Sequence, residues 1–308
     1  MPLATGLTAS GQWWSADGEG GEARFEEDTD IFRLRRREFS FPGIPAVVLR
    51  QEFLCVEGTG GAVWRPSIRF AEFVCSQEGR RSLPIAGKSV LEISSGLGLG
   101  AIVAWRLGAS PVVATDIDSE HGPLRLLEEN IRDNCGQLGA RAGRPISTSC
   151  SCSRKNQQQQ KQEDQENCSS TSPPLLEPKE HTPEQDAVSG AQGASIPTLP
   201  PPVVKTLRWG NRAQLLEAVA SLEGHGPDII LACDVVFDET MLPALTQTLL
   251  DACALRTRDG GRPVLCVSHQ RRNRAREEAF FADVSSHLGQ GLEVHREEDV
   301  SVFIFRCV

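Results

Sequence analysis

A glycine-rich stretch at residues 92–100 has the residue types and spacing of a loop that binds a nucleotide-like ligand. It reads Glu92-Ile-Ser-Ser-Gly96-Leu-Gly98-Leu-Gly100 and follows a short apolar run that predicts a buried strand. Glycines at such a turn let the backbone approach a ligand, and the N-terminus of the helix that follows favours anionic groups. Asp116 lies twenty residues after Gly96, at the expected tip of the next strand. Because a carboxylate there suits two ribose hydroxyls, the pair predicts a cofactor that contains adenosine.

The glycine pattern alone leaves the kind of cofactor open. Gly96-x-Gly98-x-x-Ala101 also matches the dinucleotide pattern of NAD and NADP enzymes, and it is compatible with a plain tight turn in which Asp116 is coincidental. Glu92 favours a third interpretation, since it ends the strand before the loop. A methyltransferase uses an acid there near the amino group of S-adenosylmethionine, whereas a dinucleotide enzyme needs that space for pyrophosphate.

Two further side chains follow predicted strands at the same edge of the sheet. Trp209 comes just after the third strand and is either an adenine contact or a tryptophan that covers the core. Asp234 ends the fourth strand, where carboxylates face the ligand crevice of an open parallel sheet. A helix N-cap is the alternative for Asp234, and Asp238 is a more favourable cap for the next helix.

The elements that must position these residues alternate between short β-rich runs and helical patterns, which is typical of parallel βαβ units. The predicted core strands are 89–93, 111–115, 203–207, 228–233, 264–268, 292–295 and 302–306. The predicted helices are 66–74, 98–107, 123–134, 214–222, 241–255 and 273–288. The last two strands have no helix between them and predict an antiparallel hairpin at one sheet edge. Residues 31–56 predict a small β meander. The fold class is therefore α/β, a Rossmann-like seven-strand sheet with helices on both faces.

Two stretches are predicted to be disordered. Residues 1–30 are rich in glycine and hold seven carboxylates against the single Arg24. Residues 143–202 are polar and of low complexity, contain no aromatic residue, and include Gln157 to Gln160 in a row. Such compositions bury too little apolar surface to offset the entropy of ordering. We therefore expect an acidic tail at 1–30 and one domain at 31–308, interrupted by the insert at 143–202.

Composition narrows the class of protein further. There are 32 Lys and Arg against 41 Asp and Glu, for a net charge of −9, so the chain is not a basic nucleic-acid coat. No apolar run approaches the roughly 20 residues of a membrane-spanning helix, and the first residues fit neither a signal nor a transit peptide. Ten Cys without regular spacing suggest free thiols in a reducing compartment. We expect a soluble cytoplasmic protein, with nuclear access open, that has no membrane partner.

Five segments together resemble a known family. In chain order they are Gly60-Gly-Ala-Val-Trp64, the 92–100 loop, Asp116, Leu207-Arg-Trp-Gly210 and Asp234-Val-Val-Phe237. This set resembles the family 16 protein-lysine methyltransferases of the methyltransferase-like 21 type, over about residues 31–308 without the insert. The resemblance implies a seven-strand enzyme that uses S-adenosylmethionine and methylates lysines of non-histone proteins such as chaperones and translation factors. Nothing in the sequence requires an oligomer, so we expect a monomer.

The resemblance also implies roles for individual residues. The implied cofactor-binding residues are Trp64, Glu92, Ser94, Ser95, Gly96, Gly98, Asp116, Trp209 and Cys233. Among these, Ser94 to Gly98 would surround the methionine portion of the cofactor, and Cys233 would line the pocket beside Asp234. The implied catalytic residues are Asp234 and Phe237, in a motif that shapes the lysine channel.

Two positions depart from the family pattern. Ser94 stands where the family usually has Gly, and Phe237 stands where it has Tyr, in a chain without any Tyr. A phenyl ring can wall the channel and attract a cationic amine, but it donates no hydrogen bond. The reaction itself needs in-line positioning of a neutral amine. We therefore expect Asp234 to orient the lysine amine while deprotonation occurs through water.

Several other features are weighed against this function. Cys150, Cys152, Cys168 and His181 lack paired metal-ligand spacing, so we expect no metal site. The basic run 271–276 predicts a solvated helix face, with contact to an acidic protein or a nucleic acid as alternatives. We expect His269 to be a satisfied loop histidine. Two other functions stay open: a methyltransferase for a small molecule or nucleic acid, and a catalytically weak binding module. Against a nucleic-acid acceptor, Asp234 to Phe237 lacks the two prolines common in nucleic-acid amino methylation.

Overall fold

The structure is a computed structural model that describes residues 6–7, 13–14, 34–52, 59–119, 122–136 and 199–307. The predicted disorder of the tail and of the insert therefore concerns residues outside the description, apart from two short strands in the tail. These are β1 (Gly6–Leu7) and β2 (Trp13–Trp14), which pair antiparallel.

The insert ends earlier than the composition suggests. Residues 199–202, which the sequence places in the insert, lie against the domain. The indole Nε1 of Trp105 donates a hydrogen bond to the Pro200 carbonyl at 2.8 Å, and Pro202 is buried. Polar and proline-rich composition does not reveal this boundary, because the contact is made by a tryptophan almost a hundred residues away.

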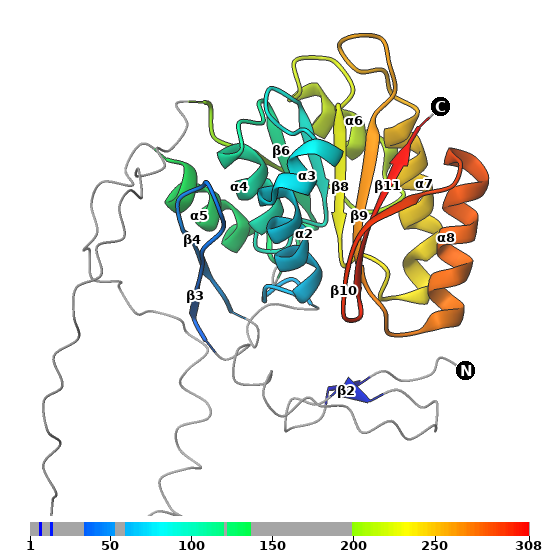
Figure 1. Cartoon of the computed structure of the whole chain (residues 1–308), viewed down its shortest axis with the longest axis horizontal. Coiled ribbons are helices and arrows are strands. Elements are labelled where there is room, and N and C mark those ends of the chain that lie inside the picture. The colour runs from blue at the N-terminus through cyan, green and yellow to red at the C-terminus, as the bar shows by residue number, and fades with distance from the viewer. Residues whose placement is uncertain are drawn as a thin grey trace, which may run out of the picture. The chain divides into compact units, whose positions relative to one another are not determined.

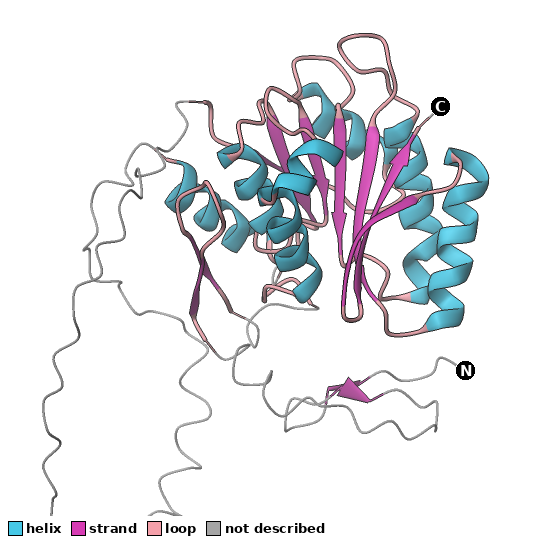
Figure 2. Ribbon diagram, in the orientation of Figure 1, coloured by secondary structure: helices cyan, strands magenta, loops and turns pink. Residues whose placement is uncertain are grey.

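A seven-stranded sheet forms the centre of the domain (Figures 1 and 2). Its strands are β5 (Val90–Ile93), β6 (Val112–Asp116), β7 (Val203–Thr206), β8 (Ile229–Cys233), β9 (Val264–Gln270), β10 (Leu292–Glu297) and β11 (Val300–Arg306). The spatial order is β10-β11-β9-β8-β5-β6-β7, and β5 to β9 are parallel. Strand β11 runs antiparallel to both β9 and β10, which confirms the predicted edge hairpin.

Helices cover both faces of this sheet, as predicted. They are α2 (Arg65–Cys75), α3 (Gln77–Ser82), α4 (Leu99–Arg106), α5 (Leu124–Cys135), α6 (Arg212–Ala220), the 3-10 helix η2 (Glu239–Met241), α7 (Leu242–Cys253) and α8 (Arg274–Leu288). The buried residues form two clusters, one with α2, α4 and α5 and the other with α6, α7 and α8. Successive residues of a core strand alternate between the clusters: Ile229 and Leu231 pack on the first side, Ile230 and Ala232 on the second. A continuous apolar run is thus what a strand covered on both faces requires.

The described part of the predicted β meander is a two-stranded hairpin of β3 (Arg36–Phe39) and β4 (Val47–Arg50). Helix α5 supplies the hydrogen-bond partners for one edge of β4. The side-chain amides of Asn130 and Asn134 both accept from and donate to backbone groups of β4, at Arg50 and Val48 respectively. Because Asn130 also donates to the Leu97 carbonyl at 3.2 Å, the hairpin is tied to the glycine-rich loop.

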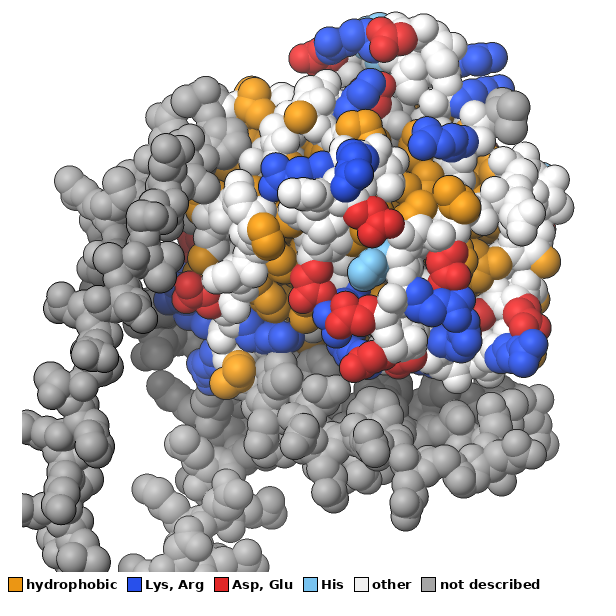
Figure 3. Space-filling model, in the orientation of Figure 1, with side chains coloured by type: hydrophobic (Ala, Val, Ile, Leu, Met, Phe, Trp, Pro, Cys, Tyr) orange, Lys and Arg blue, Asp and Glu red, His pale blue; other side chains and the backbone are white. Residues whose placement is uncertain are grey.

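Within the described ranges, no helix combines the length and apolar character needed to cross a bilayer. The face shown in Figure 3 mixes basic and acidic side chains with apolar ones between them.

Candidate functional site

The glycine-rich loop connects β5 to α4 at the point where the strand order reverses. From β5 the chain moves outward through β6 and β7, then returns to β8 on the other side of β5. In open α/β sheets, ligands bind at the carboxyl ends of the strands beside such a reversal. Gly96 and Gly98 adopt positive φ angles of 53° and 86°, which glycine reaches without steric strain. A Cβ built on Gly96 would meet only the Gly60 carbonyl, at 3.8 Å, so the loop backbone is open to close approach.

Glu92 lies beneath this loop and is only 1% exposed. Its Oε2 accepts a hydrogen bond from the Ala101 amide at 2.9 Å, so the carboxylate caps the first turn of α4 from the neighbouring strand. Burial raises the pKa of Glu92 to about 7, although hydrogen bonds from Ser95 and Ala101 oppose the rise. The acid predicted to lie near a cofactor amino group is therefore also a structural acceptor for the helix that follows the loop.

Asp116 ends β6 beside the loop, as the sequence predicts. Its Oδ2 accepts from the Gly96 amide and its Oδ1 accepts from the Ile117 amide, both at 2.8 Å. Burial raises the pKa of Asp116 to about 6, against these two hydrogen bonds. Each carboxylate oxygen has a second lone pair, so the group can still accept from two ribose hydroxyls while it holds Gly96 in place.

Ser95 supports the loop from within the sheet. Its hydroxyl accepts from the Thr115 amide at 3.1 Å, and its own amide donates to the Thr115 carbonyl at 2.8 Å. The side chain is buried. Ser95 thus joins the end of β5 to the end of β6 and keeps the glycines next to Asp116.

Trp209 meets the loop from the end of β7. Its indole Nε1 donates to the Ser94 hydroxyl at 2.9 Å, and its ring lies 5.9 Å from that of Phe237, tilted by 56°. Ser94, the residue that replaces the usual glycine, has a φ of 56°. The structure therefore brings both departures from the family pattern, Ser94 and Phe237, into contact with one tryptophan. Phe237 is 40% exposed and Trp209 is half-buried, so both rings are accessible.

Trp64 and Cys233 flank the same region. Trp64 is the N-cap of α2 and donates from Nε1 to the Thr59 carbonyl at 2.7 Å. The next residue after Thr59 is Gly60, whose carbonyl lies close to Gly96. Cys233 ends β8 and is buried, and burial raises the pKa of its thiol well above the ordinary value. It is a neutral wall residue, since a thiol nucleophile needs a lowered pKa.

Asp234 follows Cys233 and pairs with an arginine. Both oxygens accept from the Arg272 guanidinium, at 2.5 and 2.7 Å, and the Asp234 backbone has a φ of 58°. The alternative role of Asp234 as a helix N-cap does not apply, because Asp238 accepts from the Thr240 amide and caps η2.

The basic run 271–276 is not simply the solvated helix face that the sequence predicts. Arg272 binds Asp234, and Arg276 donates to the Phe237 carbonyl at 2.7 Å, whereas Arg274 pairs with Glu278 in solvent. Sequence reasoning missed Arg272 and Arg276, and its only signal was their position just after a strand at the carboxyl edge of the sheet.

His269 also differs from the prediction of a satisfied loop residue. It lies inside β9, is 4% exposed, and neither ring nitrogen has a hydrogen-bond partner among the described residues. The nearest carboxylate oxygen, from Glu277, is 3.2 Å from Nε2 but outside hydrogen-bond geometry. Burial lowers the pKa of this imidazole.

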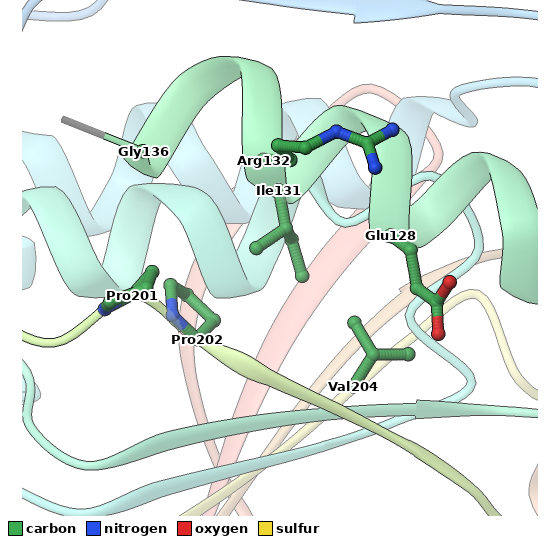
Figure 4. Close-up of a pocket in the computed structure, with 7 residues that line it drawn as sticks. All are labelled: Glu128, Ile131, Arg132, Gly136, Pro201, Pro202 and Val204. Carbon is green, nitrogen blue, oxygen red and sulfur yellow. The ribbon is translucent and has the colours of Figure 1, made fainter. Parts of the chain in front are cut away.

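No group of three or more His, Cys, Asp or Glu in the described part of the chain is placed to hold a metal ion. The cysteines and histidine considered for a metal lie outside the described residues. A pocket of about 320 Å³ lies between α5 and residues 201–204, at the start of β7. Figure 4 shows its lining residues, and none of them is a predicted site residue.

Part of the chain matches a known protein family. Residues 201–287 match the model of the lysine methyltransferase family 16. That range contains Trp209, Cys233, Asp234 and Phe237, so the predicted family resemblance is confirmed over these residues. The family description also agrees with the methyl-donor cofactor predicted from the sequence.

The individual relatives match either over a short segment or at low sequence identity. A curated ribosomal protein L11 methyltransferase from Thermotoga petrophila is 46% identical over 48 residues, which are 16% of this chain and 17% of the relative. A T. thermophilus 16S rRNA methyltransferase in complex with AdoMet and guanosine is 11% identical with a TM-score of 0.46, over 89% of this chain and 51% of that one. A ribosomal protein L11 methylase from Lactobacillus delbrueckii subsp. bulgaricus is 14% identical with a TM-score of 0.38, over 78% and 75%. The chain thus spans a sixth of the curated relative and about half of the first solved one.

Proposed function

We propose that this protein is an S-adenosylmethionine-dependent methyltransferase that methylates a lysine side chain of a non-histone protein. The observation that carries the proposal is the family match at residues 201–287, because it includes the residues that follow β7 and β8 at the carboxyl edge of the sheet. The resemblance implies a chaperone or translation factor as the acceptor. We further propose that the enzyme is a monomer and that it acts in the cytoplasm.

The residues at the carboxyl edge fit the cofactor. Gly96 offers an open backbone, Asp116 offers unused carboxylate lone pairs, and Trp209 offers a half-buried aromatic face for adenine. Glu92 supplies a carboxyl group under the loop, where the cofactor carries an ammonium group. When bound, S-adenosylmethionine supplies an activated methyl group on its sulfonium.

The acceptor side is assigned to the residues after β8. Asp234 orients the incoming amine, and Phe237 walls its path with an exposed ring that attracts cations through its face. Transfer needs the amine unprotonated, and lysine has an ordinary pKa of about 10.4. An apolar wall lowers that pKa, whereas an unpaired carboxylate raises it, so the charge state around Asp234 decides how readily the amine loses its proton to water.

Two measurements on the full chain test this function. Calorimetric titration with S-adenosylmethionine should show one site per chain, which Asp116→Asn weakens and Asp118→Asn, an exposed neighbour, leaves unchanged. Tritiated methyl transfer into a cell lysate should yield counts that protease removes and nuclease spares. Counts removed by nuclease would instead support a nucleic-acid acceptor, and a chain that binds no cofactor would be a binding module.

A further inference from the structure

Asp234, the proposed amine-orienting residue, is already engaged by a side chain that the family match does not assign. Arg272 NH1 donates to Oδ1 at 2.5 Å and NH2 donates to Oδ2 at 2.7 Å. This two-bond arrangement is the strongest that an arginine makes with a carboxylate. The Asp234 side chain is 8% exposed and that of Arg272 is 35% exposed, so the pair is largely removed from water on the aspartate side.

Arg272 is itself fixed by a chain of polar contacts. Its NH2 also donates to Gln270 Oε1 at 2.8 Å, and Gln270 Nε2 donates to Asp299 Oδ2 at 2.7 Å. Asp299, in the turn between β10 and β11, forms an ion pair with Arg65, whose NH1 lies 2.9 Å from Asp299 Oδ1. This network ends next to Trp64, at the N-terminus of α2. The guanidinium is therefore held in one orientation from two sides of the site.

The backbone at both ends of the pair is equally constrained. Asp234 has a φ of 58°, in the left-handed region that favours glycine, and its amide donates to the Ser268 carbonyl at 2.8 Å. The Arg272 amide donates to Glu277 Oε1 at 2.5 Å. Non-glycine residues are uncommon in this backbone region, and those that surrounding contacts hold there cluster at functional sites.

Other charged and titratable groups lie near the Asp234–Arg272 pair. Asp299 and Glu277 act on Arg272 from the β10–β11 turn and from α8. His269, in β9, interacts electrostatically with Asp234, and burial lowers the pKa of its imidazole. Among these groups only Arg272 makes two hydrogen bonds to the Asp234 carboxylate.

We propose that Arg272 is a positioning residue that holds Asp234 as a hydrogen-bond acceptor and cancels its charge, so that the acceptor lysine is bound as the neutral amine. This inference rests on the proposed function. A free carboxylate beside the transfer point would stabilise the ammonium form, which cannot attack a methyl group. A carboxylate neutralised by guanidinium can still accept a hydrogen bond from an amine, and it no longer favours the cation.

The test uses two cofactor analogues, so it needs no acceptor protein. In sinefungin, a carbon bearing an amino group replaces the methylated sulfonium of S-adenosylmethionine, and that amine is cationic at neutral pH. S-adenosylhomocysteine lacks the group. The ratio of their affinities, by calorimetry at pH 7.5 on the full chain, reports how well the transfer point accepts a positive charge.

Opposite effects are expected from the two halves of the pair. Arg272→Gln frees the carboxylate and should favour sinefungin over S-adenosylhomocysteine by about tenfold relative to wild type, since an unpaired carboxylate attracts the cationic amine. Asp234→Asn removes the carboxylate that pairs with the guanidinium and should shift the ratio about tenfold the other way. Arg272→Lys keeps the charge and should leave the ratio near wild type. Arg274→Gln, which removes a solvent-paired arginine two residues away, is the matched control and should change nothing.

The possible outcomes distinguish a failure of the proposed role of Arg272 from a failure of the proposed methyltransferase function. If wild type binds S-adenosylhomocysteine, and Arg272→Gln and Asp234→Asn move the ratio in the same direction or not at all, then Arg272 only stabilises the fold. If Arg272→Gln fails to fold, the loss of relative sinefungin affinity in Asp234→Asn decides alone, and an unchanged ratio there refutes the proposal. Wild type that binds neither analogue refutes the proposed function itself.

Discussion

Replacing Glu92 by Gln should make the stability of the protein without cofactor less sensitive to a rise in pH from about 4.5 to about 7. The side chain is 1% exposed, and burial raises its pKa from an ordinary 4.5 to about 7, with added repulsion from Asp116. The native state therefore holds the proton more tightly than the unfolded chain does. For a group shifted in this direction, the stabilising contribution is complete below about pH 4.5 and is lost as pH rises through about 7.

The size of the effect follows from the same values. A rise from 4.5 to about 7 corresponds to about 3 kcal/mol at 1.36 kcal/mol per pH unit. Glutamine keeps an oxygen that can accept from Ala101 but carries no charge. The free energy of unfolding of Glu92→Gln minus that of wild type should therefore increase by up to about 3 kcal/mol between pH 4.5 and pH 8. For about 200 folded residues, this corresponds to about 6–12 °C in Tm.

Urea unfolding of both proteins at several pH values measures this difference. Constant costs of the substitution, such as an amide nitrogen without an acceptor, cancel because only the change with pH is compared. Burial and two backbone hydrogen bonds set the raised pKa of Asp116, about 6, in both proteins, so most of its contribution cancels as well. A difference that stays flat from pH 4.5 to pH 8 would show that Glu92 is ionised at its ordinary pKa and that the reasoning from burial is wrong.

Three other substitutions probe the elements around the loop. Gly100→Ala should destabilise the protein by about 1–3 kcal/mol in urea, because its Cβ would lie 2.1 Å from Glu92 Oε1, whereas Gly261→Ala, with a contact of 3.4 Å, should be mild. Asn130→Ala should lower the free energy of unfolding by about 2–4 kcal/mol, since it leaves the Arg50 backbone and the Leu97 carbonyl without their partner. Urea titration measures this change, and Gln247→Ala, which removes an exposed hydrogen bond to Asp251, is the control. Asp116→Asn should weaken S-adenosylmethionine binding about 10- to 100-fold in calorimetry, the loss of a charge-assisted hydrogen bond, and unchanged affinity would remove Asp116 from the ribose site.

The parts of the fold and site that depend on local pattern were predictable from sequence. An apolar run such as Ile229 to Cys233 is buried on both faces whatever its partners are, so the run identifies a core strand. Glycines between a strand and a helix predict the loop, and strand length fixes Asp116 at its edge. Parallel strands with helices between them then bring the carboxyl ends together, as the predicted grouping of Asp116, Trp209 and Asp234 requires.

Contacts between side chains far apart in sequence were not predictable. Asn130 meets β4 eighty positions away, and its amide does not differ in sequence from that of a solvent-exposed helical asparagine. Arg272 lies 38 positions from Asp234, in a run whose composition is the same as that of a solvated helix face. Both depend on how the loops and helices are placed around the sheet, and no periodicity or motif encodes that placement.

Ser94 and Asp234 are the two non-glycine residues at this site that have positive φ angles. Each follows a core strand, β5 or β8, at the two sides of the strand-order reversal, and each has a positive φ, 56° and 58°. A glycine would adopt these angles without strain, but it offers no side chain. Ser94 accepts from Trp209, and Asp234 accepts twice from Arg272, so each strained residue is bonded to a side chain from another strand end. The hydrogen bonds that offset the strain also fix the two groups that the proposed function needs most, an aromatic face for adenine and an acceptor for the amine.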